Sequence, residues 1–270
     1  MVDWNGDGTD VQTVAGSTPA LTHVYTDDGP RTIGITAIDP YGVYTTSKAV
    51  SIAHVPPAIQ SLAATSANEG AVTQLSGTMV DPNVNDSHVL NVDWGDGATN
   101  SYSYAVGVQA FNVTHVYANN PPSGTYTVNT TITDNKGGSG TAATTAAVAN
   151  VAPTISSFST TASTTTEGGT TSVLGSLVDP GTLDSHTVMI AWGDGTQSAA
   201  TVDDTTHLFT ASHQYIQDSG AGTYALTATV TDSDGATGRR ARPPRSSTSS
   251  RWSPSGPSAT PTRSRARSRR

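Results

Sequence analysis

The sequence predicts an all-β chain in which two-sheet sandwiches follow one another in tandem. Three observations lead to this prediction. Hydrophobic residues make up only 34% of the 270 residues, and Thr, Gly, Asn and Asp, which favour strands and turns, are abundant. Short runs that alternate between apolar and polar residues are separated by clusters of turn residues. Several short motifs also recur at intervals of 90 and 98 residues.

The clearest recurring motif is a tryptophan followed by a Gly-Asp-Gly turn. Its copies lie at 94–97, at 192–195 and, with Asn5 inserted, at 4–8. A His-x-Tyr strand follows each copy, at 23–25, 115–117 and 213–215. The tryptophan can fill the gap between two sheets. The turn suits its residues, because Gly accepts a positive φ and Asp can bond to nearby backbone.

The repeat length fixes the expected domain organisation. A period of this size matches an immunoglobulin-like sandwich, which has about 100 residues. The second copy contains seven strand-like runs, near 57–66, 70–80, 88–94, 98–106, 110–117, 124–133 and 139–150. We therefore expect four parts: a partial repeat at 1–55, a complete repeat at 56–151, a repeat lacking its last strand at 152–238, and a disordered Arg/Ser/Pro-rich tail at 239–270.

Together these motifs resemble the polycystic kidney disease (PKD) repeat family over residues 1–238. The residues that carry the resemblance are the Trp-Gly-Asp-Gly turn, the His-x-Tyr strand and a Gly-Thr-Tyr strand at 124–126 and 222–224. The first repeat departs from the pattern, because Asn5 is inserted and Arg31 stands where the others have Tyr126 and Tyr224. The resemblance implies seven-stranded immunoglobulin-like sandwiches, an extracellular or cell-surface location, and service as a spacer or contact module.

The resemblance also sets the functional expectation. We expect a non-catalytic structural or adhesion module of a larger surface or secreted protein, with protein or polysaccharide partners. The alternative is a carbohydrate- or protein-binding accessory of a secreted hydrolase. No apolar run reaches the roughly 18 residues of a membrane span. The charge of −18 on residues 1–238 repels phosphate, so we expect no nucleic acid partner for the repeats.

Two motifs could suggest chemistry but have plainer explanations. Asp-Ser-His occurs at 86–88 and 184–186, yet adjacent residues of one extended loop cannot form the hydrogen-bonded geometry of a catalytic triad. We therefore expect no enzymatic activity. His23, His115 and His213 recur two residues before a tyrosine, without a second ligand at metal-binding spacing, which favours histidines bonded within a sheet.

No cofactor is required by these motifs, and Ca²⁺ is the one ion that two acidic sites could take. Asp3, Asn5 and Asp7 place oxygens at positions 1, 3 and 5 of a calcium-type loop with Gly6 next. Val14 stands where such a loop needs a bidentate Glu. The alternative is a polar turn closed by its own side chains.

The second calcium candidate lies at the expected joints between repeats. The loops after the second strand and before the last strand of such a sandwich share one pole. In the third repeat these loops carry Asp179, Asp184, Asp232 and Asp234, and we expect Asp96 of the preceding repeat to face them. Carboxylates gathered in this way suit Ca²⁺, which prefers hard oxygen ligands. The alternative is that each aspartate closes its own turn.

We predict that residues 239–270 are not native to the array. They carry ten Arg and no acidic residue, and with many Ser and Pro they cannot build a core. The break falls where a Thr/Ala/Val strand is due by analogy with 139–150, so our hypothesis is a frame shift in a GC-rich gene; the alternative is a genuine basic tail. Sequencing the coding DNA tests it. We expect another frame to continue the repeat, and if neither does, the hypothesis is wrong.

Overall fold

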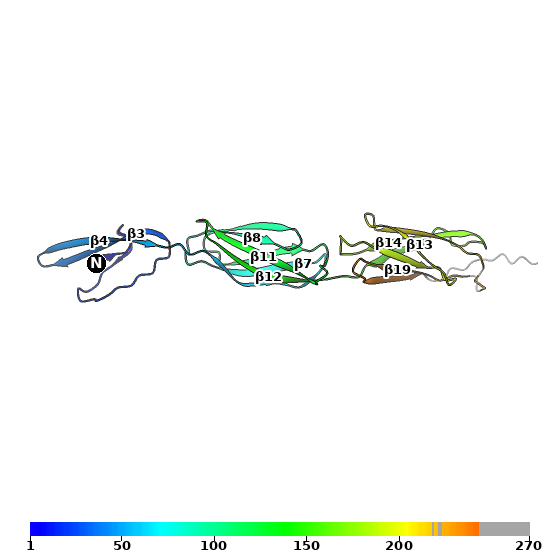
Figure 1. The fold of residues 1–270 in the computed structure, drawn as a ribbon, viewed down its shortest axis with the longest axis horizontal. Coiled ribbons are helices and arrows are strands. Elements are labelled where there is room, and N and C mark those ends of the chain that lie inside the picture. Colours follow the sequence, from blue (N-terminus) through cyan, green and yellow to red (C-terminus); the bar gives the residue numbers. More distant parts are fainter. Residues whose placement is uncertain (218, 221–222, 243–270) are drawn as a thin grey trace, which may run out of the picture. The chain divides into compact units, whose positions relative to one another are not determined.

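The computed structural model describes residues 1–217, 219–220 and 223–242, and strands are the regular elements found there. Two compact units are present, and we describe each by itself. Figure 1 shows their strands as a ribbon. Unit 1 consists of residues 1–153 together with the loops 179–185 and 232–236. Unit 2 consists of the described residues within 154–178, 186–231 and 237–242. The all-β prediction is confirmed.

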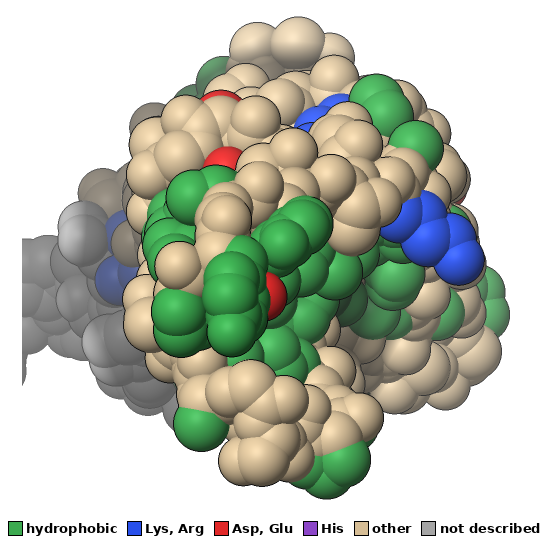
Figure 2. All heavy atoms as spheres, turned by 90° about the vertical axis from the view of Figure 1, so that its left-hand side faces the viewer, with side chains coloured by type: hydrophobic (Ala, Val, Ile, Leu, Met, Phe, Trp, Pro, Cys, Tyr) green, Lys and Arg blue, Asp and Glu red, His purple; other side chains and the backbone are tan. Residues whose placement is uncertain are grey.

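Unit 1 begins with a single four-stranded sheet. Its strand order is β2-β1-β3-β4, with bounds Val11–Gln12, Val2–Asp3, Gly29–Asp39 and Gly42–Ile52. Among the described residues no second sheet belongs to this segment. Its hairpin leaves apolar side chains in solvent, including Ile38 and Tyr41, the latter 92% exposed. Figure 2, which faces this end of the molecule, shows apolar side chains gathered there.

The second segment of unit 1 is a complete two-sheet sandwich. One sheet has the order β10-β7-β5, with bounds Ala110–Val116, Val72–Val80 and Ala58–Ala64. The other has the order β6-β12-β11-β8-β9, with bounds Ala67–Asn68, Ser139–Ala149, Thr125–Asp134, His88–Asp93 and Thr99–Tyr104. All seven strands expected from the sequence are present within two residues of their expected ends, and the two-residue β6 is an addition.

Alternation of side chains builds the core of this sandwich. In β8 every second residue is buried, and in β11 the buried residues include Val128 and Ile132. Because side chains point alternately to the two faces of a strand, these positions meet between the sheets. Trp94 is fully buried within the same cluster, which places the largest side chain of the repeat at the centre of its core.

Unit 2 is a second sandwich of two four-stranded sheets. The first has the order β13-β14-β18-β17, with bounds Thr154–Thr160, Thr170–Val178, Leu208–Gln214 and Thr201–Asp203. The second has the order β16-β15-β19-β20, with bounds Gln197–Ala199, Thr187–Ala191, Leu226–Thr231 and Thr237–Arg242. Trp192, Ile190 and Phe209 lie in its core.

The end of unit 2 corrects one expectation. Residues 239–242, which we expected to belong to a disordered tail, form most of β20 and pair along β19. Strand pairing uses only backbone groups, so arginines are accepted at a sheet edge. Arg240 also donates from Nη1 to the Ile155 carbonyl at 2.9 Å. The third repeat therefore has a last strand of six residues, and the remainder of the predicted tail, 243–270, lies outside the described residues.

Candidate functional site

The recurring motif residues form one hydrogen-bonded and stacked network in the middle repeat. The imidazole of His115 stacks on Trp94, with ring centroids 4.7 Å apart and planes 13° from parallel. His115 Nε2 donates to Asp96 Oδ2 at 2.7 Å. Tyr117 donates its hydroxyl to the backbone carbonyl of Trp94 at 3.0 Å. The turn is thereby fastened to β10, a strand of the opposite sheet.

Unit 2 repeats the network residue for residue. His213 stacks on Trp192 at 4.8 Å and donates from Nε2 to Asp194 Oδ2 at 2.7 Å. Tyr215 donates to the Trp192 carbonyl at 2.8 Å. Burial opposes ionisation of Asp194, but hydrogen bonds from Thr196 and His213 outweigh it and lower the pKa of Asp194 to about 2.

The first segment keeps this network in altered form. His23 stacks on Trp4 at 4.9 Å, and Tyr25 donates to the Trp4 carbonyl at 3.0 Å. The carboxylate beside His23 Nε2 belongs to Asp10, at 3.2 Å, and not to the turn aspartate Asp7. The inserted Asn5 lengthens the turn, so the histidine meets a carboxylate three residues further along the chain.

A second tyrosine supports the network in both complete sandwiches. Tyr126 stacks on Tyr117 with centroids 4.4 Å apart and donates its hydroxyl to the Asn119 carbonyl. Tyr224 stacks on Tyr215 at the same distance and donates to the Gln217 carbonyl. Bonding to a carbonyl several residues upstream is how a corner tyrosine fixes a turn in immunoglobulin-like folds.

The histidines of the two Asp-Ser-His loops each lie beside an aspartate from outside the motif. His88 Nε2 lies 2.9 Å from Asp81 Oδ2, and both side chains are almost fully buried. In unit 2, His186 Nδ1 lies 2.8 Å from Asp204 Oδ1. A nucleophile must sit within hydrogen-bond reach of its base, and one ring nitrogen of each imidazole is taken by a carboxylate, that of Asp81 for His88 and that of Asp204 for His186.

The first calcium candidate closes on its own backbone. Asp3 Oδ1 accepts hydrogen bonds from the amides of Asn5 and Gly6, and its Oδ2 accepts one from Gly8. Asp7 Oδ1 accepts from the amide and the hydroxyl of Thr9, which lowers the pKa of Asp7. This is the bonding of a polar turn, the alternative considered for this loop.

Three buried carboxylates converge elsewhere in unit 1. Glu69, Asp179 and Asp184 are 1%, 5% and 6% exposed. One ligand oxygen from each lies within 4.8 Å of the others. Glu69 accepts hydrogen bonds from the amides of Val151 and Asn120, at 2.7 and 3.0 Å. These three residues form what we call the carboxylate cluster.

The remaining acidic residues of the second calcium candidate divide into two groups. Asp232 accepts from the Asn150 side-chain amide at 3.1 Å, and with Asp234 it adds negative charge around Asp184. Asp96 is not in the carboxylate cluster, because it bonds to His115 and to the amide of Ala98. The sequence predicts that Asp96 faces these loops, whereas in unit 1 Glu69 is the residue that lies with Asp179 and Asp184.

Electrostatics make the carboxylate cluster unusual. Burial raises the pKa of Asp184, and the charges of Asp179, Asp234 and Asp232 raise it further, against one hydrogen bond from Ser233. Burial likewise raises the pKa of Glu69, with added repulsion from Asp184 and Asp179. Buried carboxylates normally have partners that offset the lost hydration; Glu69 has two backbone amides, whereas Asp184 has the Ser233 hydroxyl on Oδ1 and no hydrogen-bond donor on its buried Oδ2.

A related cluster in unit 1 carries its own cation. His54, Asp86 and Asp134 also bring potential ligand atoms within 4.8 Å of one another. Here Lys136 contacts Asp27 and Asp28 and lies 3.9 Å from Asp86. Hydrogen bonds to Asp27 and Asp28 raise the pKa of Lys136, so the ammonium stays charged among these acids.

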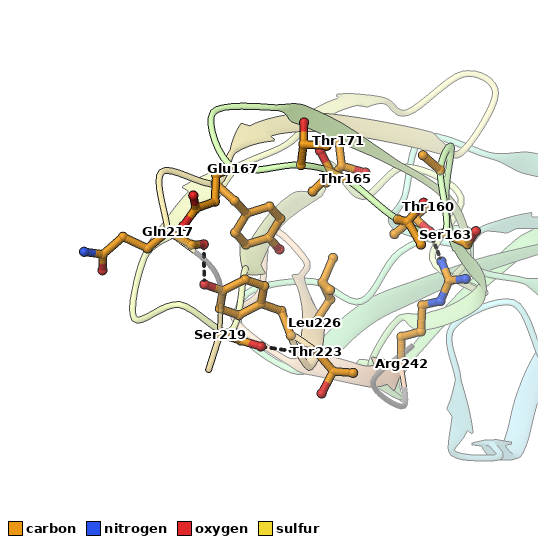
Figure 3. Close-up of a pocket in the computed structure, with 15 residues that line it drawn as sticks. Thr160, Ser163, Thr165, Glu167, Thr171, Gln217, Ser219, Thr223, Leu226 and Arg242 are labelled. Atoms are coloured by element: carbon orange, nitrogen blue, oxygen red, sulfur yellow. Dashed lines mark hydrogen bonds between the residues drawn. The ribbon is translucent and has the colours of Figure 1, made fainter. Parts of the chain in front are cut away.

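Unit 2 contains a pocket beside its stacked tyrosines (Figure 3). Tyr215, Tyr224 and several threonines line it, Glu167 lies at its rim, and Arg242 donates to Thr160 Oγ1 at 2.6 Å. The two tyrosine rings face each other at 4.4 Å. Each ring therefore uses one face for the other ring, and Tyr215 is also buried.

The sequence comparisons support a PKD domain in the middle of the chain. Residues 54–148 match the family model of the PKD domain, which confirms the resemblance drawn from the motifs for this segment. No curated protein matches the sequence of this chain. In the described part of the chain, no helix has the length and apolar character that crossing a membrane requires.

Several solved structures are similar to this chain. The PKD domain of an M14-like peptidase from a Thermoplasmatales archaeon is 20% identical, with a TM-score of 0.30, over 36% of this chain and 99% of that one. A tetra-tandem repeat from the extending region of a large adhesion protein is 19% identical, with a TM-score of 0.44, over 82% and 57%. A bacterial ice-binding adhesin is 16% identical, with a TM-score of 0.28, over 73% and 66%.

We predict that Trp94→Ala lowers the free energy of unfolding of the middle repeat by about 3–5 kcal/mol, the usual cost of removing a buried large aromatic side chain. The substitution also leaves His115 without its stacking partner. Urea titration of the full chain measures the change. Tyr41→Ala, at an exposed position, serves as the control and should change stability by less than about 0.5 kcal/mol. A loss below about 1 kcal/mol for Trp94→Ala would contradict the structural role of this tryptophan.

Proposed function

We propose that this chain is a non-catalytic repeat module of a larger extracellular or cell-surface protein, in which it provides spacing and contact. The observation that supports this most is the use of the recurring polar residues. Asp96, His115 and Tyr117 all bond within their own repeat. Their counterparts in unit 2 do the same. The residues that define the repeat therefore stabilise it, and a module repeated for its fold is suited to filling distance.

The PKD domain match at 54–148 supports a location outside the cell, because the PKD resemblance implies extracellular placement. The charge distribution agrees with this assignment. Residues 1–238 carry −18, and a large net charge of one sign keeps protein surfaces soluble and opposes self-association.

The alternative function, in which the chain binds polysaccharide as an accessory of a secreted hydrolase, requires a surface that can bind sugars. The pocket of unit 2 is the feature that favours it, since aromatic side chains and polar groups line it. Its tyrosines stack on each other and thereby cover one face of each ring, and Tyr215 is buried, so Tyr224 is the one of these two rings that could offer a face to a sugar. We therefore place the spacer function first.

Single-molecule pulling on the full chain tests the spacer function. We expect a separate cooperative unfolding event for the middle repeat, which releases about 300 Å of chain, because an extended chain spans at most about 3.3–3.6 Å per residue. Retention of the same protein on insoluble polysaccharides is measured in parallel. Extension without a cooperative event would contradict the spacer function, and strong retention that Tyr224→Ala abolishes would favour the accessory function.

A further inference from the structure

We propose that unit 1 contains a calcium site formed by Glu69, Asp179 and Asp184. The loop that follows β6 supplies Glu69, and the loop 179–185, which packs in the same unit, supplies both aspartates. Each side chain is more than nine-tenths buried. Their potential ligand oxygens lie within 4.8 Å of one another, a separation that one cation can bridge.

An unpartnered oxygen points into this cluster. Asp184 Oδ1 accepts a hydrogen bond from Ser233, but Asp184 Oδ2 is buried without a hydrogen-bond partner. A Cβ atom built on Gly181 would lie 2.4 Å from Asp184 Oδ2 and 2.9 Å from Glu69 Oε2. Both oxygens therefore flank the space beside Gly181, and a side chain at that position would intrude on it.

The middle repeat shows how the same loop is satisfied without a metal. Ninety-eight residues earlier in the sequence, Asp86 corresponds to Asp184 and Asn83 corresponds to Gly181. The Asn83 amide donates to Asp86 Oδ2 at 2.8 Å and to Asp27 Oδ1 at 2.9 Å. With glycine in place of this asparagine, the equivalent carboxylate oxygen loses its donor.

The positive charge that lies near Asp86 in the middle repeat is also replaced by a negative charge in the third repeat. Lys136 corresponds to Asp234, so the cation of one copy is replaced by an acid in the other. The ammonium of Lys136 contacts Asp27 and Asp28 beside Asp86. The charges that act on Asp184 come from Asp179, Asp234 and Asp232, which are all acidic. The two copies thus present the same pair of loops, and the proposed calcium ion takes the place at Asp184 that Lys136 and Asn83 hold beside Asp86.

Calcium fits this chemistry better than other common ions. It takes six to eight oxygen ligands in flexible geometry, whereas Mg²⁺ requires a near-ideal octahedron and keeps several waters. When the side-chain amide of Asn120 is turned so that its nitrogen faces the acids, it donates to Glu69 Oε2 at 3.1 Å and to Asp234 Oδ2 at 3.2 Å. Asn120 then holds the carboxylates of Glu69 and Asp234 in place. A bound ion would hold the loop 179–185 against Glu69.

Isothermal titration of CaCl₂ into the full chain tests the proposal. We expect one site with a Kd of about 10⁻⁴–10⁻³ M, the range of extracellular calcium-binding modules, and weaker heat with MgCl₂. Glu69→Gln should weaken binding at least about tenfold. Glu167→Gln, which alters the other glutamate of the sequence in the same Glu-Gly context, is the matched control and should bind calcium as the unaltered chain does.

Asp234→Lys distinguishes loss of the site from loss of the fold. Asp234 is exposed, and the variant supplies the ammonium that Lys136 provides in the middle repeat, so we expect a folded chain by circular dichroism that no longer binds calcium. Absence of heat at about 10 mM calcium, tenfold above the weakest Kd expected, would overturn the proposal. Unchanged binding in both Glu69→Gln and Asp234→Lys would also overturn it. Neither result bears on the spacer function, which makes no use of a metal.

Discussion

Each repeat depends on one interaction: a histidine stacks on the core tryptophan, and an aspartate carboxylate pairs with the same imidazole. Trp94 directly follows β8 of one sheet, while His115 lies in β10 of the other sheet and Tyr117 directly follows β10. A small sandwich with few large apolar residues needs a strong link between its sheets. The network supplies that link with one buried aromatic ring and two short hydrogen bonds.

This constraint explains why the turn has its particular sequence. Gly95 has φ of +84°, and a Cβ atom there would lie 2.4 Å from the Thr127 carbonyl oxygen. Only glycine allows β11 to pass this close. Asp96 then reaches His115 because the turn is tight, and in the first segment, where Asn5 lengthens the turn, His23 meets Asp10 instead. The motif is therefore one connected unit.

The repeat architecture could be predicted from sequence because its signals are local. Alternating residues and turn clusters identified the seven strands of the middle repeat, and the recurring tryptophan identified a core position. The partner of the acidic loops could not be predicted in this way. Glu69 meets Asp179 and Asp184 only through folding, although the Glu-Gly pair at 69–70 and 167–168 was a usable signal. Strand β20 was missed because backbone pairing at a sheet edge does not require an apolar sequence.

A double-mutant cycle on Asp96→Ala and His115→Ala in the full chain tests the account most directly. Hydrogen exchange of the β8, β10 and β11 amides reports the stability of the middle repeat, while the β15 and β19 amides of unit 2 serve as an internal control. If the network links the sheets, the two substitutions should be coupled by about 0.5–3 kcal/mol, as for residues in direct contact. Additive losses, equal within about 0.3 kcal/mol to the sum of the single losses, would contradict the account.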